Sequence, residues 1–129
     1  MRVLPDSHIL AWFADDAPKL THEMRAIIED EENELFFSAA SLWELTIKRA
    51  LNRSGFNISP RVLHRALLDN GFQEVHVSTE LALAVESLPP IHKDPFDRIL
   101  IAQSISEGML LLTSDETVAQ YDGPIRLVR

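Results

Sequence analysis

The chain has 129 residues, which is the length of one domain. Its hydrophobic fraction of 46% and charged fraction of 25% are those of a folded globular protein and exclude intrinsic disorder. The absence of cysteine excludes a disulfide framework, a thiolate metal cluster and a thiol nucleophile. A net charge of −8 argues against binding nucleic acid through bulk positive charge, but not against reaching phosphates through bound cations.

The beginning of the chain carries Arg2 and Asp6 within its first few residues, so we expect no signal peptide. No stretch approaches the roughly 20 apolar residues that are needed to cross a bilayer. We therefore expect a cytoplasmic protein with no membrane association.

In the first half of the chain, short apolar runs alternate with stretches of helical periodicity. The first run, residues 3–4, is cut short by Pro5. The predicted strands of this half are 3–4 and 35–38, and the predicted helices are 8–13, 21–29 and 39–50.

The second half continues the alternation. Asp94 and Pro95 form a strong helix start, because the carboxylate caps the helix and proline suits the first helical position; Gly108 is placed to end that helix. The predicted helices here are 61–69, 79–88 and 95–107, and the predicted strands are 74–77, 109–113 and 125–128. Residues 1–129 therefore predict a single α/β domain, a three-layer α/β/α sandwich around a mostly parallel sheet of about five short strands.

Four acidic residues follow four different predicted strands. Asp6 comes directly after the first, Glu44 lies in the helix after the second, Asp97 in the first turn of the 95–107 helix, and Asp115 just after the 109–113 strand. Parallel sheets bind ligands outside the carboxyl ends of their strands, so these acids are expected to converge there. Converging carboxylates need a cation, and hard oxygen ligands favour Mg²⁺ or Mn²⁺. Such a site suits phosphodiester hydrolysis.

Each acid also has a purely structural interpretation. Asp97 and Asp115 would serve as helix caps, Asp6 as a turn residue, and Glu44 as a solvated helix residue. These interpretations are favoured for any one residue alone. For all four together, on four strand ends, the functional interpretation is favoured.

Four sequence motifs resemble those of PIN-domain ribonucleases of the VapC toxin type. They are Val3-Leu4-Pro5-Asp6-Ser7-His8-Ile9-Leu10-Ala11-Trp12, Ser38-Ala39-Ala40-Ser41-Leu42-Trp43-Glu44-Leu45, His92-Lys93-Asp94-Pro95-Phe96-Asp97-Arg98 with Ile101-Ala102-Gln103, and Leu112-Thr113-Ser114-Asp115. They occur in the family's order and span nearly the whole chain.

The resemblance implies a PIN-like fold and a metal-dependent endoribonuclease toxin. Its catalytic and metal-binding acids would be Asp6, Glu44, Asp97 and Asp115, supported by Ser7, Thr113 and Asp94. It also implies a homodimer neutralised by a cognate antitoxin of the Phd/YefM-like type. We expect RNA contacts from a further set of side chains: Lys48, Arg49, Arg53, His92 and Arg98.

Pro5 departs from the family pattern, which has an aliphatic residue before the first aspartate. A proline in a central strand removes a backbone donor, so displacement of Asp6 and a weakened nuclease are expected if the strand is distorted. One alternative is thus a non-catalytic PIN-fold protein-interaction module. Another is a receiver-type phosphoacceptor, although the last strand lacks the lysine such a domain needs. Trp12 and Trp43 are expected in the core or at an interface rather than as stacking partners of nucleobases.

Overall fold

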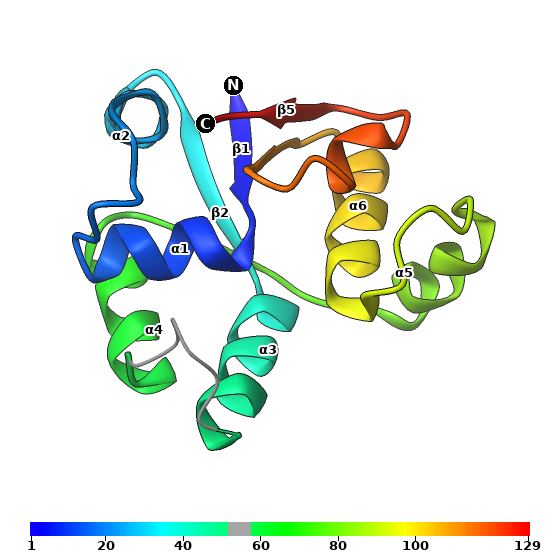
Figure 1. Ribbon diagram of the computed structural model, residues 1–129, viewed down its shortest axis with the longest axis horizontal. Coiled ribbons are helices and arrows are strands. Elements are labelled where there is room, and N and C mark those ends of the chain that lie inside the picture. The colour runs from blue at the N-terminus through cyan, green and yellow to red at the C-terminus, as the bar shows by residue number, and fades with distance from the viewer. Residues whose placement is uncertain (52–57) are drawn as a thin grey trace.

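The central element of the computed structural model, which describes residues 1–51 and 58–129, is a parallel sheet (Figure 1). Within these residues five strands pair in the order β3-β2-β1-β4-β5, and every recorded pairing is parallel. The strands are β1 (Arg2–Pro5), β2 (Glu34–Ser38), β3 (Gln73–Val75), β4 (Leu110–Thr113) and β5 (Ile125–Leu127). The predicted α/β class is confirmed, and the sheet is entirely rather than mostly parallel.

Helices cover both faces of this sheet (Figure 1). The elements on one side are α1 (Ser7–Ala14), α2 (His22–Glu29), α3 (Ala39–Ala50) and α4 (Pro60–Asp69). The elements on the other side are α5 (Thr79–Ala84), α6 (Pro95–Glu107) and the short 3₁₀ helices η1 (Val85–Ser87) and η2 (Val118–Gln120). The three-layer sandwich is therefore as the sequence predicts.

Neighbouring residues of the strands supply two separate cores. Phe37 and Leu112 pack with the helices of the α1 side, whereas Phe36 and Leu111 pack with α6 and η2. Successive side chains of a strand point to opposite faces, so a continuous apolar run is what a strand buried on both faces requires. This explains why the strands read as unbroken hydrophobic segments.

The capping residues place the ends of α6 close to where they were predicted. The Asp94 carboxylate accepts a 2.9 Å hydrogen bond from the Phe96 amide, and Pro95 occupies the first turn. Gly108 ends the helix in the left-handed conformation, with φ of 66°. Elsewhere the boundaries differ: β3 ends at Val75 instead of residue 77. The helix predicted over 79–88 is split into α5 and η1.

Pro5 does not distort β1. It is in register with Leu112 of β4, and the next amide, that of Asp6, donates a 2.9 Å hydrogen bond to the Leu112 carbonyl. Successive residues of a central strand direct their amides to opposite neighbours, so the Pro5 nitrogen faces β2. The recorded register between β1 and β2 ends before it, at Val3 with Leu35. The proline therefore stands where the strand tolerates a missing donor.

The strand order contains one topological switch point, between β1 and β4. From β1 the chain proceeds outward to β2 and β3, and it then returns to the other side of β1 to form β4 and β5. Ligands of open α/β sheets bind at this point, outside the carboxyl ends of the strands. The order also differs from the flavodoxin-like 2-1-3-4-5 arrangement that a receiver domain requires, which removes that alternative.

Among the residues that the structure describes, no helix combines the length and the apolar character needed to span a bilayer.

Candidate active site

Asp6 lies at the end of β1, directly at the switch point, and is buried. Its Oδ1 accepts the Ile9 amide at 3.0 Å, which caps α1, and its Oδ2 accepts the Thr113 hydroxyl at 2.7 Å. Burial raises the pKa of Asp6, while the bonds from Ile9 and Thr113 lower it. Asp6 thus caps α1 and also lies at the switch point. Its hydrogen bonds show that Pro5 does not displace it.

Glu44 reaches the same region from α3. Its side chain is 1% exposed, so it is not the solvated helix residue that the alternative interpretation supposed. The Ser7 hydroxyl donates a 2.6 Å hydrogen bond to Glu44 Oε1, and Lys48 pairs with Oε2 from one turn further along the helix. Ser7 therefore supports Glu44, which joins the start of α1 to α3.

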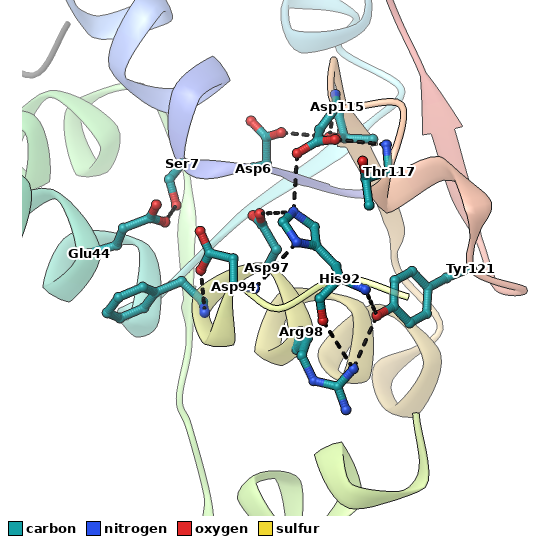
Figure 2. A network of polar contacts seen from close by, with 12 residues as sticks. Asp6, Ser7, Glu44, His92, Asp94, Asp97, Arg98, Asp115, Thr117 and Tyr121 are labelled. Carbon is teal, nitrogen blue, oxygen red and sulfur yellow. Dashed lines mark hydrogen bonds and ion pairs between the residues drawn. The ribbon is translucent and has the colours of Figure 1, made fainter. Parts of the chain in front are cut away.

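Asp97 lies in the first turn of α6 and faces the other acids (Figure 2). Burial above all, together with the charges of Asp94, Glu44 and Asp6, raises its pKa to about 7 against the lowering effect of His92. Asp94 caps the same helix as Asp97, whereas Glu44 and Asp6 belong to other elements and lie near enough for their charges to act on Asp97. A bound cation would stabilise the ionised form of Asp97 by offsetting this repulsion.

Asp115 follows β4 and completes the set. Its amide donates to the Thr113 hydroxyl at 3.0 Å, and its Oδ1 accepts the Thr117 amide at 2.8 Å, a local turn that orients the side chain. Its Oδ2 lies 3.3 Å from His92 Nε2. Asp115 thus orders the turn after β4 and contacts His92, while its catalytic role stays a prediction.

The imidazole of His92 lies between Asp97 and Asp115 (Figure 2). Nε2 is 2.9 Å from Asp97 Oδ2 and 3.3 Å from Asp115 Oδ2, and these three side chains could together surround a metal ion. The Asp94 amide, however, donates to Nδ1 at 3.3 Å. With that lone pair engaged, the neutral ring carries its proton on Nε2 and acts as a donor to the two carboxylates rather than as a metal ligand.

The donor set fits a hard divalent cation. Among the described residues, Asp97 and Asp115 are close enough to share an ion, and Asp6 and Glu44 lie near enough to raise the pKa of Asp97. Carboxylate oxygens are the ligands that Mg²⁺ and Mn²⁺ prefer. The raised pKa of Asp97 reflects burial and repulsion that a cation would relieve. Ser7 and Thr113 hold two of the four carboxylates by hydrogen bonds, while Asp94 caps α6 and orients His92.

Arg98 has a structural task that the sequence did not reveal. Its guanidinium donates to the Tyr121 hydroxyl at 3.1 Å, and the same hydroxyl accepts the His92 amide at 2.8 Å. It also donates to four carbonyl oxygens of the segment before α6, those of Val85, Leu88, Pro89 and His92. Arg98 therefore holds the His92 loop, and its contact with RNA stays a prediction. Tyr121 was missed, because it is 29 positions from its partner and carries no local signal.

The other basic residues of the predicted RNA path lie on or beyond α3. Lys48 is engaged with Glu44, and Arg49 is exposed in the last turn of the helix. Arg53 falls outside the described residues. Trp43 is 60% exposed and so is not a core residue, whereas Trp12 is half-buried against the α1 core.

The five-stranded parallel sheet with an acidic cluster at its switch point defines an α/β protein with a candidate cation site. The profile of the PIN-domain family matches residues 3–124, and the chain belongs to that family. Comparison with curated proteins finds no match.

The solved structures that share the fold include the following two. The first is VapBC2 from Rickettsia felis, bound to a DNA fragment from the VapBC2 promoter. Its TM-score is 0.72, with 12% identity and 98% of each chain covered. The second is VapC20 from Mycobacterium tuberculosis, a toxin that cleaves the sarcin-ricin loop, with a TM-score of 0.63, 14% identity and coverage of 92% of this chain and 95% of that one. The structural neighbours are thus VapC toxins, as the motifs predicted.

Proposed function

We propose that the protein is a metal-dependent endoribonuclease toxin. The observation that carries the proposal is the meeting of acids from separate elements at the switch point: Asp97 and Asp115 lie on either side of His92, and the charges of Asp6 and Glu44 raise the pKa of Asp97. PIN domains are typically nucleases, and one structural neighbour is a toxin that cleaves RNA.

The four carboxylates would hold Mg²⁺ or Mn²⁺. When bound, the cation lowers the pKa of a coordinated water and neutralises charge on the scissile phosphate. The chain's own residues orient this set: Thr113 holds Asp6, and Ser7 holds Glu44. Because both acceptors are buried, these hydroxyls keep the carboxylates in single orientations.

RNA phosphates would be contacted from the α3 side and from the loop before α6. Lys48 and Arg49 supply positive charge beside Glu44. His92 presents an Nε2 donor between two of the acids, where a phosphate oxygen could accept it. Arg53 stays part of the same proposal on sequence grounds alone. The hydrogen bonds of Asp6 support an intact catalyst over a PIN-fold module that has lost its acid.

The proposed partner is a cognate antitoxin of the Phd/YefM-like type, with the toxin itself a homodimer. The likeness to VapBC2 of Rickettsia felis supports a paired protein of this kind. Cytoplasmic localisation remains a prediction.

Incubation of purified protein with single-stranded RNA tests the proposal. Cleavage should require Mg²⁺ or Mn²⁺, and Asp97→Asn should abolish it because the amide keeps the size of the side chain but loses the charge that binds the cation. The matched control is Asp122→Asn, an exposed acid outside the site, which should cleave normally. Cleavage that persists in excess chelator would refute the metal mechanism.

A further inference from the structure

Two aromatic side chains sit at the rim of the carboxylate cluster, and the nuclease chemistry does not use them. Trp43 is the residue before Glu44, and Phe96 is the residue before Asp97. The rings of Trp43 and Phe96 pack edge to face, with centroids 5.2 Å apart and an interplanar angle of 83°. This contact joins α3 to α6 beside the site.

The indole of Trp43 is unusually exposed for a residue of its size. It is 60% accessible, although tryptophan is normally among the more buried residues. Phe96 packs against the indole with the two ring planes nearly perpendicular, which holds the indole in place. The pair is therefore a fixed aromatic surface that remains open to solvent.

Phe96 also forms part of a groove of about 350 Å³. The groove is lined by Ile47, Lys48, Leu51, Lys93, Asp94, Pro95 and Phe96. Lys48, on this lining, pairs with Glu44, so the groove adjoins an acid of the proposed site. Its walls combine apolar surface with two lysines and a single acid, whose carboxylate already caps α6.

We propose that Trp43, braced by Phe96, is a stacking platform for a nucleobase of the RNA substrate adjoining the scissile phosphate. The inference rests on the proposed nuclease function and adds a base-binding position to it. Single-stranded nucleic acids are bound by aromatic rings that stack on bases next to cationic groups that follow the phosphates. Trp43 supplies an exposed ring in contact with Phe96, and Phe96 lines the groove together with two lysines, so both requirements are met. In a chain with a net charge of −8, the lysines of this groove favour an anionic ligand, and the exposed indole beside them favours one that carries bases.

Tryptophan fluorescence tests the proposal directly, because the chain has only two tryptophans. The variant Trp12→Phe leaves Trp43 as the sole emitter. Combined with Asp97→Asn to prevent cleavage, it is titrated in Mg²⁺ with a short single-stranded oligoribonucleotide of mixed sequence, and with an abasic strand carrying the same number of phosphates. The RNA should quench Trp43 emission, and the abasic strand should not.

Affinity for the same dye-labelled RNA, measured by anisotropy in the Asp97→Asn background, provides the second readout. Trp43→Ala should weaken binding about five- to a hundredfold, whereas Trp43→Phe should retain most of it because an aromatic face remains. The control is Leu83→Ala, which removes an equally exposed apolar side chain away from the site and should bind normally.

Three results would overturn the platform: no quenching, equal quenching by the abasic strand, or unchanged RNA affinity of Trp43→Ala. If that unchanged affinity came with a smaller mass in sedimentation, Trp43 would instead anchor a second copy of the chain. Failure of the nuclease proposal itself would be recognised separately, since wild-type protein would then leave RNA intact in Mg²⁺ and Mn²⁺.

Discussion

The hydroxyl of Thr113 donates a 2.7 Å hydrogen bond to Asp6 Oδ2 and thereby ties the carboxyl end of β4 to that of β1. Both side chains are buried, and the bond crosses the switch point of the sheet. The same hydroxyl accepts the Asp115 amide at 3.0 Å. One threonine therefore orients two of the four carboxylates, although they are 109 positions apart in the chain.

Replacement of Thr113 should impair the metal site. Thr113→Val preserves shape but removes the hydroxyl, so Asp6 loses a bond that lowers its pKa and the Asp115 amide loses its acceptor. We expect weaker Mn²⁺ binding by calorimetry and a loss of about 1–3 kcal/mol in the free energy of unfolding. Thr113→Ser is the control, because it keeps the hydroxyl and should keep the metal affinity. Equal affinity of the valine and serine variants would contradict this role.

Asp97 should make the metal-free protein less stable as the pH rises. Its pKa is raised from 3.8 to about 7, so the folded state holds this proton to higher pH than the unfolded chain does. The free energy of unfolding therefore decreases between about pH 4 and pH 7 and levels off above that range. Asp97→Asn, which resembles the protonated acid, escapes this loss. In chelator the variant should exceed wild type by ~1–4 kcal/mol at pH 8, and by less at pH 5.

Denaturant titrations at the two pH values measure this difference, with Asp122→Asn as the control that should show none. Addition of Mn²⁺ at pH 8 should reverse the order, because the cation stabilises wild type more than Asp97→Asn. A stability advantage of Asp97→Asn that is the same at pH 5 and pH 8 would contradict the assignment to Asp97.

Pro5 should prove harmless to the site. Since the Asp6 amide keeps its bond to Leu112 and the Pro5 nitrogen faces β2 beyond the last recorded pair, an aliphatic residue there restores no partner that the carboxylate needs. Pro5→Val should therefore leave the Mn²⁺ dissociation constant unchanged in calorimetry. A clearly tighter site in Pro5→Val would show that the proline weakens the native metal centre.

Arg98 should act through the loop that carries His92. Arg98→Met keeps much of the length of the side chain but removes the donors that bind the segment before α6 and the Tyr121 hydroxyl. A hydrogen bond from a charged donor contributes about 1.5–3 kcal/mol to stability. Because several such bonds are lost, we expect the free energy of unfolding to fall by at least about 2 kcal/mol. The surface control Arg61→Met on α4 should lose little. If both variants unfold alike, Arg98 does not hold the loop.

Much of the fold could be predicted because its signals are local. Asp94, Pro95 and Gly108 mark the ends of α6 through capping and backbone preferences that depend on a few neighbours. The unbroken apolar run of β4 indicates a strand buried on both faces. The division of the 79–88 segment into α5 and η1 was not foreseen, because no proline or glycine marks it.

The site was predictable only in part, for the same reason. Strand-end placement identified the four acids, but not the bonds between distant elements that orient them. Arg98 is predicted to contact RNA, but nothing in the sequence indicates its bonds to backbone carbonyls and to Tyr121. The exposure of Trp43 was also unforeseeable, since helical periodicity alone does not show which neighbours cover a side chain.

The central claim is that a divalent cation binds among the switch-point carboxylates, and anomalous diffraction from crystals soaked in Mn²⁺ tests it most directly. We predict a manganese peak within coordination distance of Asp6 and Asp97 oxygens, and its absence from crystals of Asp97→Asn. A wild-type map with no peak between these carboxylates, or with manganese bound only elsewhere on the surface, would contradict the account.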